Sequence, residues 1–324
     1  MMKKMLMALM MFGVMALLVA CGGEKEADKS AEKTADDKPE VEEVKEVEVK
    51  HELDKEVVTV PKNPEKVVVF DFGILDTFDA LGIEDQVAAL PKGSLPGYLE
   101  KFEDDKYTNV GSLKEPDFEA IHALEPDLII ITGRQSDMYE EFKEIAPTIY
   151  VGLDTSDYMV SFKHNMDLVA EIFGKEDEMA KELTEIDEQI AAINEKVSAQ
   201  EETALITLAN EGKISAYGKS SRFGIIHDVF GFKPADEKIE SSTHGQSITF
   251  EYILETNPGI LFVVDRGAAI GGEASANMVE NELVMKTDAY ANEKIIYLNG
   301  EYWYLSGGGL LSMKAMVEEV EQAL

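Results

Sequence analysis

The same order of apolar and polar positions occurs twice in the chain. Residues 117–134 read "DFEAIHALEPDLIIITGR", and residues 249–266 read "TFEYILETNPGILFVVDR". Each segment has a helix-capping residue, apolar residues at helical spacing, a proline and then an apolar run. This order predicts a short helix, a tight loop and a strand buried on both faces, which is typical of a parallel sheet covered by helices. Each segment ends with an arginine, Arg134 or Arg266, just past its predicted strand.

The rest of the pattern extends this arrangement through both halves of the chain. Apolar runs predict further strands at residues 66–73, 86–90, 148–152, 204–210, 213–218 and 294–300. Apolar spacing predicts helices at residues 73–83, 221–232 and 310–324. Residues 176–197 contain neither proline nor glycine and predict a helix about 33 Å long. We therefore expect an α/β fold of two Rossmann-like lobes joined by a single long backbone helix.

The first residues follow a different pattern. Lys3 and Lys4 precede an uncharged apolar run from Met5 to Ala20, which has the length of a signal-peptide core and is short for a membrane span. The run ends "LVAC", two glycines follow, and Cys21 is the only cysteine of the chain. This motif resembles the lipobox of bacterial lipoproteins, which implies cleavage before Cys21 and a lipid on its sulfur. A plain secretory signal with an incidental cysteine is the alternative.

The segment after the cysteine is mostly Glu, Asp, Lys and Ala, with too little apolar surface to offset the entropy of an ordered chain. At 324 residues, the chain is long enough for two lobes. The expected organisation is a signal peptide (1–20), a lipidated cysteine with a disordered acidic tether (21–55), an N-terminal α/β lobe (56–160), bridging helices (161–200) and a C-terminal α/β lobe (201–324).

The formal net charge of −34 excludes some partners and constrains others. It argues against nucleic acid, whose phosphates require a basic surface, and it means that an anion site would need locally placed cations. Of the 30 basic residues only three are arginines, Arg134, Arg222 and Arg266. The planar, permanently charged guanidinium suits a multiply charged, oxygen-rich anion, so we expect the three to share a ligand site at the carboxyl ends of the strands. Surface salt bridges are the alternative.

Two further residues could ligate iron(III). His244 lies in the polar loop "SSTHGQS", and Tyr304 lies in "EYWYLSGGG", which we expect to be extended. Imidazole and tyrosinate are both competent iron(III) ligands. Spacing alone favours the ordinary alternatives, a hydrogen-bonded loop histidine and a tyrosine packed on the core. In an extended segment Trp303 would face away from Tyr304, and we expect it beside the ligand cleft.

Glu119 and Glu251 occupy equivalent positions in the first turn of the two repeated helices. An acidic side chain there interacts favourably with the helix dipole, which is a sufficient structural reason for both. A matched pair of carboxylates, one in each lobe, could also dock a partner with two-fold symmetry.

The sequence contains no evident catalytic set. The motifs G-x-S-x-G, H-E-x-x-H and C-x-x-C do not occur, and the five histidines lack the spacing of metal ligands. We therefore expect a binding protein that is not an enzyme and has no cofactor of its own. A lipid-anchored hydrolase and a structural or adhesive lipoprotein are the rivals from other classes.

These features together resemble the class III substrate-binding proteins of ABC importers. Over residues 56–324 the chain is most similar to siderophore-binding lipoproteins of the petrobactin type. The stretches that carry the resemblance are "VPKNPEKVVVFDFGILDTFDALGI", "VGSLKEPDFEAIHALEPDLIIITGRQSDMYEEF", "APTIY" and "EYWYLSGGGL". The resemblance implies capture of a ferric catecholate siderophore on the outer side of the cytoplasmic membrane.

The resemblance also implies roles for the ligand-site residues. Arg134, Arg222 and Arg266 match an arginine triad that clamps the anionic ferric complex. His244 and Tyr304 match a histidine and a tyrosine that complete the iron shell when the siderophore is only tetradentate.

The partners are implied in the same way. Glu119 and Glu251 match glutamates that engage arginines of an ABC permease dimer, which works with its ATPase. The membrane is reached through the lipid on Cys21, and a monomer is expected. Haem, cobalamin or another metal complex is the alternative ligand for the same fold.

Overall fold

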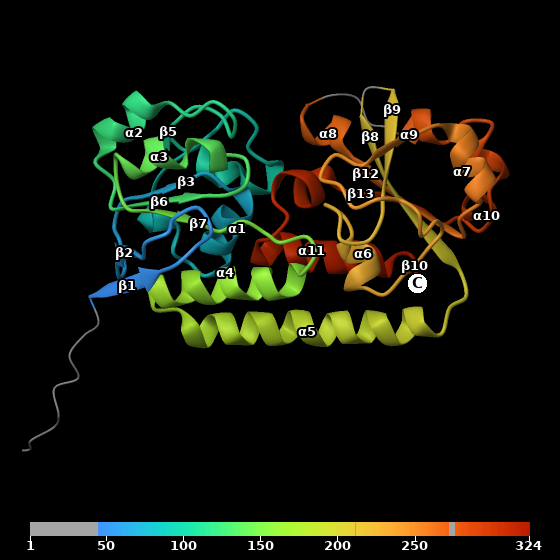
Figure 1. The fold of residues 1–324 in the computed structure, drawn as a ribbon, viewed down its shortest axis with the longest axis horizontal. Helices are drawn as coiled ribbons and strands as arrows, with labels where there is room; N and C mark the ends of the chain where they lie inside the picture. Colours follow the sequence, from blue (N-terminus) through green and yellow to red (C-terminus); the bar gives the residue numbers. More distant parts are fainter. Residues whose placement is uncertain (1–44, 211, 272–275) are drawn as a thin grey trace, which may run out of the picture. The chain divides into compact units, whose positions relative to one another are not determined.

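Two β-sheets, one in each half of the chain, organise the protein (Figure 1). The structure is a computed structural model and describes residues 45–210, 212–271 and 276–324. The expected signal peptide, Cys21 and most of the expected tether lie outside the described residues. The α/β fold with two lobes is confirmed.

The N-terminal lobe is built on a parallel sheet of order β5-β4-β3-β6-β7. Alternate side chains of the buried strand β6 enter two different apolar cores, because helices cover both faces of the sheet. The elements of this lobe are β1 (Glu46–Val49), β2 (Val58–Pro61), β3 (Val67–Val69), α1 (Phe72–Ala80), η1 (Glu84–Gln86), β4 (Val87–Leu90), η2 (Gly97–Glu103), β5 (Thr108–Asn109), α2 (Phe118–Leu124), β6 (Leu128–Ile131), η3 (Ser136–Met138), α3 (Tyr139–Lys143) and β7 (Thr148–Tyr150).

The C-terminal lobe is built on a mixed sheet of order β11-β9-β8-β12-β13, and β10 pairs with β8 outside this order. Strands β8, β12 and β13 are parallel, whereas β9 runs antiparallel to β8. The elements of this lobe are β8 (Thr203–Asn210), β9 (Lys213–Tyr217), α6 (Ile225–Asp228), β10 (Lys233–Pro234), β11 (Gln246–Ile248), α7 (Phe250–Thr256), β12 (Ile260–Asp265), α8 (Arg266–Ala269), α9 (Ala276–Val279), η4 (Val284–Lys286), α10 (Asp288–Ala291), β13 (Ile295–Leu298), η5 (Glu301–Leu305) and α11 (Leu310–Glu321).

The two sequence repeats fold alike, as predicted. Asp117 and Thr249 cap α2 and α7, and each side chain accepts a hydrogen bond from the backbone N–H three residues on. Both helices end at a left-handed residue, Glu125 or Asn257, each with φ of 47°. A proline follows, and the chain then enters the interior strand β6 or β12. Equivalent local signals therefore bring the chain to equivalent strand ends in the two lobes.

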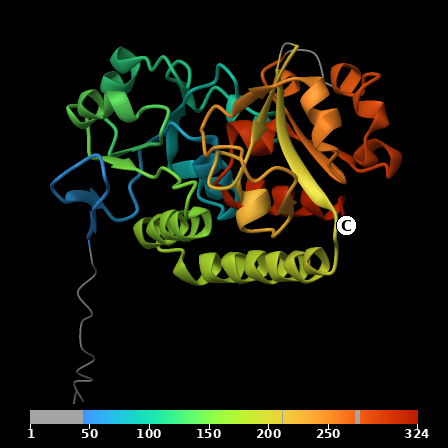
Figure 2. The same ribbon diagram turned by 45° about the vertical axis from the view of Figure 1, so that its right-hand side comes forward.

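Helices α4 (Tyr158–Phe173) and α5 (Glu176–Ser198) connect the lobes and lie side by side (Figure 2). Helix α11 packs against α5 and also against α1 of the N-terminal lobe. One continuous apolar core includes residues of β3, α5, β12 and α11. The long helix predicted from the sequence is present, and α11 lies beside it as a second connection between the lobes. The residues that α5 buries form one stripe: Met179, Leu183, Ile186, Ile190, Ile193 and Val197.

The described structure begins earlier than the sequence indicated. Residues 46–49, which we expected in the disordered tether, form β1 and pair antiparallel with β2. Val47 and Val49 are both 3% exposed. Alternating valines in "EVEV" are sufficient for a two-stranded hairpin once an apolar surface is available, although the surrounding composition is charged.

Two other expected elements differ. Only Ile225–Asp228 of the predicted helix 221–232 is helical; Val229 is its C-cap, and Gly231, with a positive φ of 84°, lies beyond the end of the helix. Residues 301–305, expected to be extended, form the single wide helical turn η5. Aromatic residues at successive positions suggested a strand there, but contacts with neighbouring elements determine the conformation.

Candidate functional site

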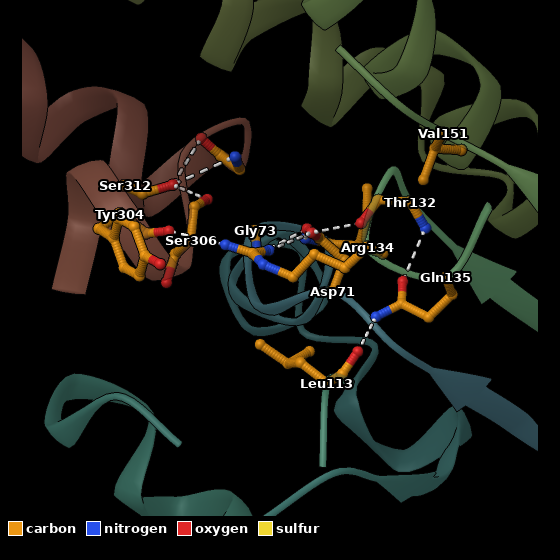
Figure 3. Close-up of polar contacts among 12 residues, drawn as sticks. Asp71, Gly73, Leu113, Thr132, Arg134, Gln135, Val151, Tyr304, Ser306 and Ser312 are labelled. Atoms are coloured by element: carbon orange, nitrogen blue, oxygen red, sulfur yellow. Dashed lines mark hydrogen bonds and ion pairs between the residues drawn. The ribbon is translucent and has the colours of Figure 1, made fainter. Parts of the chain in front are cut away.

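Three arginines converge on one tyrosine. The Nη2 atoms of Arg134 and Arg222 both donate to the carbonyl oxygen of Tyr304, each at 2.7 Å. The guanidinium carbon of Arg222 lies 4.1 Å from the centre of the Tyr304 ring, and that of Arg266 lies 5.1 Å from it. Figure 3 shows the Arg134 side chain directed toward Tyr304. We call these four residues the arginine–tyrosine cluster.

Different elements supply the four residues. Arg134 follows β6, and Arg266 is the first residue of α8, directly after β12. Arg222 lies between β9 and α6, and Tyr304 lies in η5. The repeated arginines thus come from the carboxyl ends of interior strands of both sheets, where α/β proteins commonly bind ligands.

Within the part of the chain that the structure describes, the three arginines of the cluster form a single ion pair. Asp71 Oδ2 lies 3.9 Å from Arg134 Nη1, and in the described part of the chain no ion pair within 4.0 Å involves Arg222 or Arg266. Arg266 instead donates to the side-chain oxygen of Asn210. Burial, and then the charge of Arg134, lowers the pKa of Arg222. Among the described residues these three partly buried guanidinium groups have one distant ion-pair partner, and such an arrangement favours a multiply charged anion.

The same charges act on the phenol of Tyr304. Burial alone would raise its pKa. A hydrogen bond from Arg266 and the positive charges of Arg222, Arg266 and Arg134 outweigh burial, so the pKa is lowered. The cluster therefore favours the phenolate more than an ordinary tyrosine site does.

His244 lies at the edge of the cluster. The residue is exposed, and its carbonyl accepts a hydrogen bond of 3.0 Å from the hydroxyl of Tyr217. Burial raises the pKa of Tyr217, and the charge of Arg222 opposes this rise, so Tyr217 lies within the field of the cluster. No group of three or more His, Cys, Asp or Glu side chains among the described residues could hold a metal ion. The loop of His244 is thus close to the cluster, and its role as an iron ligand stays a prediction.

One acidic neighbour of the cluster was missed in the sequence. Asp71 caps α1 by accepting from the backbone N–H groups of Gly73 and Ile74, and it also accepts from the Thr132 hydroxyl at 3.2 Å. Burial raises the pKa of Asp71, and the nearby charge of Arg134 opposes that rise. An acid directly after the apolar run "VVVF" was the available signal, because a helix begins at that point.

Trp303 does not lie where we expected. Its side chain is buried, with 4% of its surface exposed, and its Nε1 donates to Glu319 Oε2 of α11 at 2.8 Å. The indole therefore packs behind η5 against α11, next in sequence to Tyr304. It can report on the position of the turn that carries Tyr304.

Glu119 and Glu251 are both exposed in the first turns of α2 and α7. Their equivalent positions follow from the repeat, and their role in docking stays a prediction. None of the described helices is long and apolar enough to span a membrane.

Comparison with known proteins relates this chain to binding proteins of one family. Residues 67–302 match the periplasmic binding protein family. The petrobactin-binding protein YclQ of Bacillus subtilis is 51% identical over 324 residues, covering 100% of this chain and 99% of YclQ. The ferric-anguibactin-binding protein FatB of Vibrio anguillarum is 31% identical over 84% of this chain and 85% of FatB.

Solved structures agree with these relatives. The crystal structure of YclQ has a TM-score of 0.84 and covers 86% of this chain and 98% of that structure. The periplasmic catecholate-siderophore binding protein VctP of Vibrio cholerae has a TM-score of 0.81 at 34% identity, covering 86% of this chain and 99% of VctP. The chain belongs to the periplasmic binding protein family, whose members are substrate-binding components of transport systems.

Proposed function

We propose that the protein captures a ferric catecholate siderophore, petrobactin or a close relative, and delivers it to an ABC importer. The observation that carries this proposal is the convergence of three arginines on Tyr304 in a chain with a net charge of −34. A ferric catecholate complex presents several negative charges on outward-facing oxygens. Each charge-assisted hydrogen bond to such an oxygen contributes about 1.5–3 kcal/mol.

The relatives narrow the ligand class. YclQ binds petrobactin, as its name states, and VctP binds a catecholate siderophore. The full-length match to YclQ at 51% identity supports petrobactin for this chain. A bare metal ion is itself a cation and would leave the positive charge of the cluster unmatched.

His244 and Tyr304 have a conditional role in this proposal. A hexadentate siderophore fills the iron shell by itself, so neither side chain is then required. A tetradentate siderophore leaves two positions open, which the Tyr304 phenolate and a neutral His244 would fill. The pKa of Tyr304, lowered against the effect of burial by Arg266 and the other arginines, supports the phenolate role.

The remaining partners complete the proposal. Glu119 and Glu251 would engage the permease dimer, one carboxylate from each lobe, and Cys21 would carry the lipid that holds the protein at the outer face of the cytoplasmic membrane. The protein would act as a monomer, with the ferric complex as cargo, no cofactor of its own and no catalytic activity.

The decisive experiment is a titration of protein lacking residues 1–21 with ferric petrobactin, ferric enterobactin, iron-free petrobactin and haem. Quenching of Trp303 and the visible absorbance of the ferric complex give two independent signals. We expect saturable binding of ferric petrobactin, weaker binding of the iron-free form and a large loss of affinity in Arg134→Ala.

Lys219→Ala is the matched control, because it removes an exposed positive charge three residues from Arg222. It should bind as the unaltered protein does. Saturable binding of haem alone, or equal loss in the Arg134 and Lys219 variants, would contradict the assignment of the ligand and of the cluster.

A further inference from the structure

The turn that carries Tyr304 is attached to the N-terminal lobe, although it follows the last strand of the C-terminal lobe. Gly97 N–H donates to Glu301 Oε1 at 3.0 Å, and the rings of Tyr98 and Tyr302 lie 4.7 Å apart. Leu310 N–H donates to the hydroxyl oxygen of Thr77 in α1 at 3.1 Å. These contacts join residues more than 200 positions apart.

Asp76 of α1 is at the centre of this attachment. Its Oδ1 accepts from Leu311 N–H at 3.1 Å, and its Oδ2 accepts from Ser312 N–H at 3.0 Å and from the Tyr98 hydroxyl at 3.0 Å. The side chain is fully buried. Asp76 thus caps α11 from another helix, because Gly309 at the N-cap position has no side chain to do so.

The backbones of α1 and of the segment that begins α11 also lie in close contact. A Cβ atom on Gly309 would collide with the carbonyl oxygen of Gly73 and with Asp76. A Cβ atom on Gly73 would collide with the carbonyl oxygen of Ser306. Ser312 Oγ in turn donates to Ser306 O at 3.0 Å, two residues from Tyr304 (Figure 3). A short, fully bonded path therefore leads from Asp76 through Ser312 and Ser306 to Tyr304.

We propose that Asp76 is a positioning residue of the arginine–tyrosine cluster, which fixes the start of α11 to α1 and so sets where Tyr304 stands against Arg134. This inference rests on the proposed function for its effect on affinity. Tyr304 is then held in a fixed position relative to α1 and Arg134 of the N-terminal lobe. Arg222 and Arg266 contact it from the C-terminal lobe. Asp76 thus holds the turn that carries Tyr304 in place, although Asp76 itself does not contact the ligand.

Substitution of Asp76 by asparagine tests the inference with little change of volume. The amide cannot accept from both backbone N–H groups and the Tyr98 hydroxyl as a carboxylate does, so the start of α11 should loosen. We expect affinity for ferric petrobactin to fall about tenfold, because about 1.4 kcal/mol of site distortion corresponds to that factor. The visible circular dichroism of the bound ferric complex should also change at saturation, since it depends on the geometry of the contacts.

Asp79→Asn is the control, because Asp79 lies on the same helix but pairs with Lys101 near the surface. It should leave both affinity and dichroism unchanged. A folded Asp76→Asn protein with unaltered affinity and dichroism would overturn the proposal. If Asp76→Asn does not fold, Thr77→Val removes the neighbouring acceptor of Leu310 N–H and must show the same two effects.

Hydrogen exchange of the ligand-free protein separates this inference from the proposed function. The amides of residues 304–312 should exchange faster in Asp76→Asn than in Asp79→Asn. Faster exchange in a protein that binds no ferric siderophore would leave the positioning role intact and reject the ligand. Unaltered exchange alongside tight ferric petrobactin binding would keep the ligand and reject the positioning role.

Discussion

At the scale of single residues, the three arginines occupy positions where a lysine could not make the same set of contacts. Arg134 and Arg222 share one carbonyl acceptor, and Arg222 also lies against the Tyr304 ring. The planar guanidinium makes both contacts and still presents donors to a ligand. An ammonium group would make fewer of these contacts at once.

Replacement of Arg222 by lysine should therefore weaken binding even though the charge is kept. We expect affinity for the ferric siderophore to fall about 10-fold to 100-fold, the equivalent of one lost charge-assisted hydrogen bond of about 1.5–3 kcal/mol. Isothermal titration calorimetry measures this change. The reverse exchange at an exposed neighbour, Lys219→Arg, should have no effect, and an equal effect of the two substitutions would show that only net charge matters.

The protonation of Asp76 predicts how stability depends on pH. Burial raises the pKa of Asp76 to about 7, although hydrogen bonds from Ser312 and Tyr98 lower it. Because burial makes the folded protein bind this proton more readily than the unfolded chain does, the free energy of unfolding falls as pH rises from the ordinary aspartate pKa of about 4 to about 7, and it changes little above that. Relative to Asp76→Asn, the free energy of unfolding should fall from about pH 4 to about pH 7, by a few kcal/mol at most, since one pKa unit is about 1.4 kcal/mol.

Urea denaturation at several pH values gives this difference. Asp79→Asn should keep the pH dependence of the unaltered protein. Parallel curves for the unaltered protein and Asp76→Asn would mean that Asp76 does not titrate in this range.

At the scale of elements, the helices and strands that depend on local sequence signals could be predicted from the sequence. The repeated helices and strands were predictable because a cap, a helical spacing, a proline and an apolar run all indicate the same structure. The turn η5 and the hairpin strand β1 were not, since the first depends on contacts with η2 and α11 and the second on a surface formed by distant residues. The convergence on the carbonyl of Tyr304 depends on that same turn, so it could not be read from spacing.

The contact between α1 and the start of α11 should not tolerate a larger residue. We expect Gly309→Ala to lower the free energy of unfolding by about 1–3 kcal/mol, because the new Cβ would collide with Gly73 and Asp76. Thermal and chemical denaturation both report the change. Gly93→Ala is the control, since its Cβ would meet Ser112 at an ordinary 3.5 Å and should have little effect.

The first turns of α2 and α7 should matter for transport and not for capture. In Glu119→Gln and Glu251→Gln we expect unaltered affinity for the ferric siderophore and reduced iron uptake by cells that depend on this protein, with the double variant most impaired. Glu255→Gln, also exposed on α7, is the control and should transport normally. Normal uptake in the double variant would remove the docking role of both glutamates.

At the scale of the whole molecule, the joint between the lobes is broad. Helix α5 shares an apolar core with both sheets, and α11 packs on α5 and α1 together. Separating the lobes would expose buried side chains of this core, which is unfavourable at about 25 cal/mol per Å² of apolar surface. A sequence reading could predict the long helix from its lack of proline and glycine, but not that the last helix lies beside it.

This breadth predicts a small change on ligand binding. Small-angle X-ray scattering of the protein without residues 1–21 should give the same radius of gyration, within error, with and without saturating ferric siderophore. The Arg134→Ala variant, which should not saturate, is the reference for any effect of free ligand. A clear decrease of the radius in the unaltered protein alone would show that the lobes close by a large rotation.

The β1–β2 hairpin has a mechanical consequence for a chain that is held from its N-terminal side. Glu46 pairs with Pro61, so the two ends through which a load would enter and leave lie next to each other. A force applied to the chain before Glu46 would separate the residue pairs of the hairpin one after another. The free energy needed to expose the buried side chains of Val47 and Val49 would resist this separation. Residues 46–61 would then add up to about 50 Å of reach while both large sheets stay intact. Force spectroscopy should detect the opening of the hairpin as the first unfolding step and the one that requires the lowest force. The hairpin would then lengthen the attached chain under load before either large sheet unfolds.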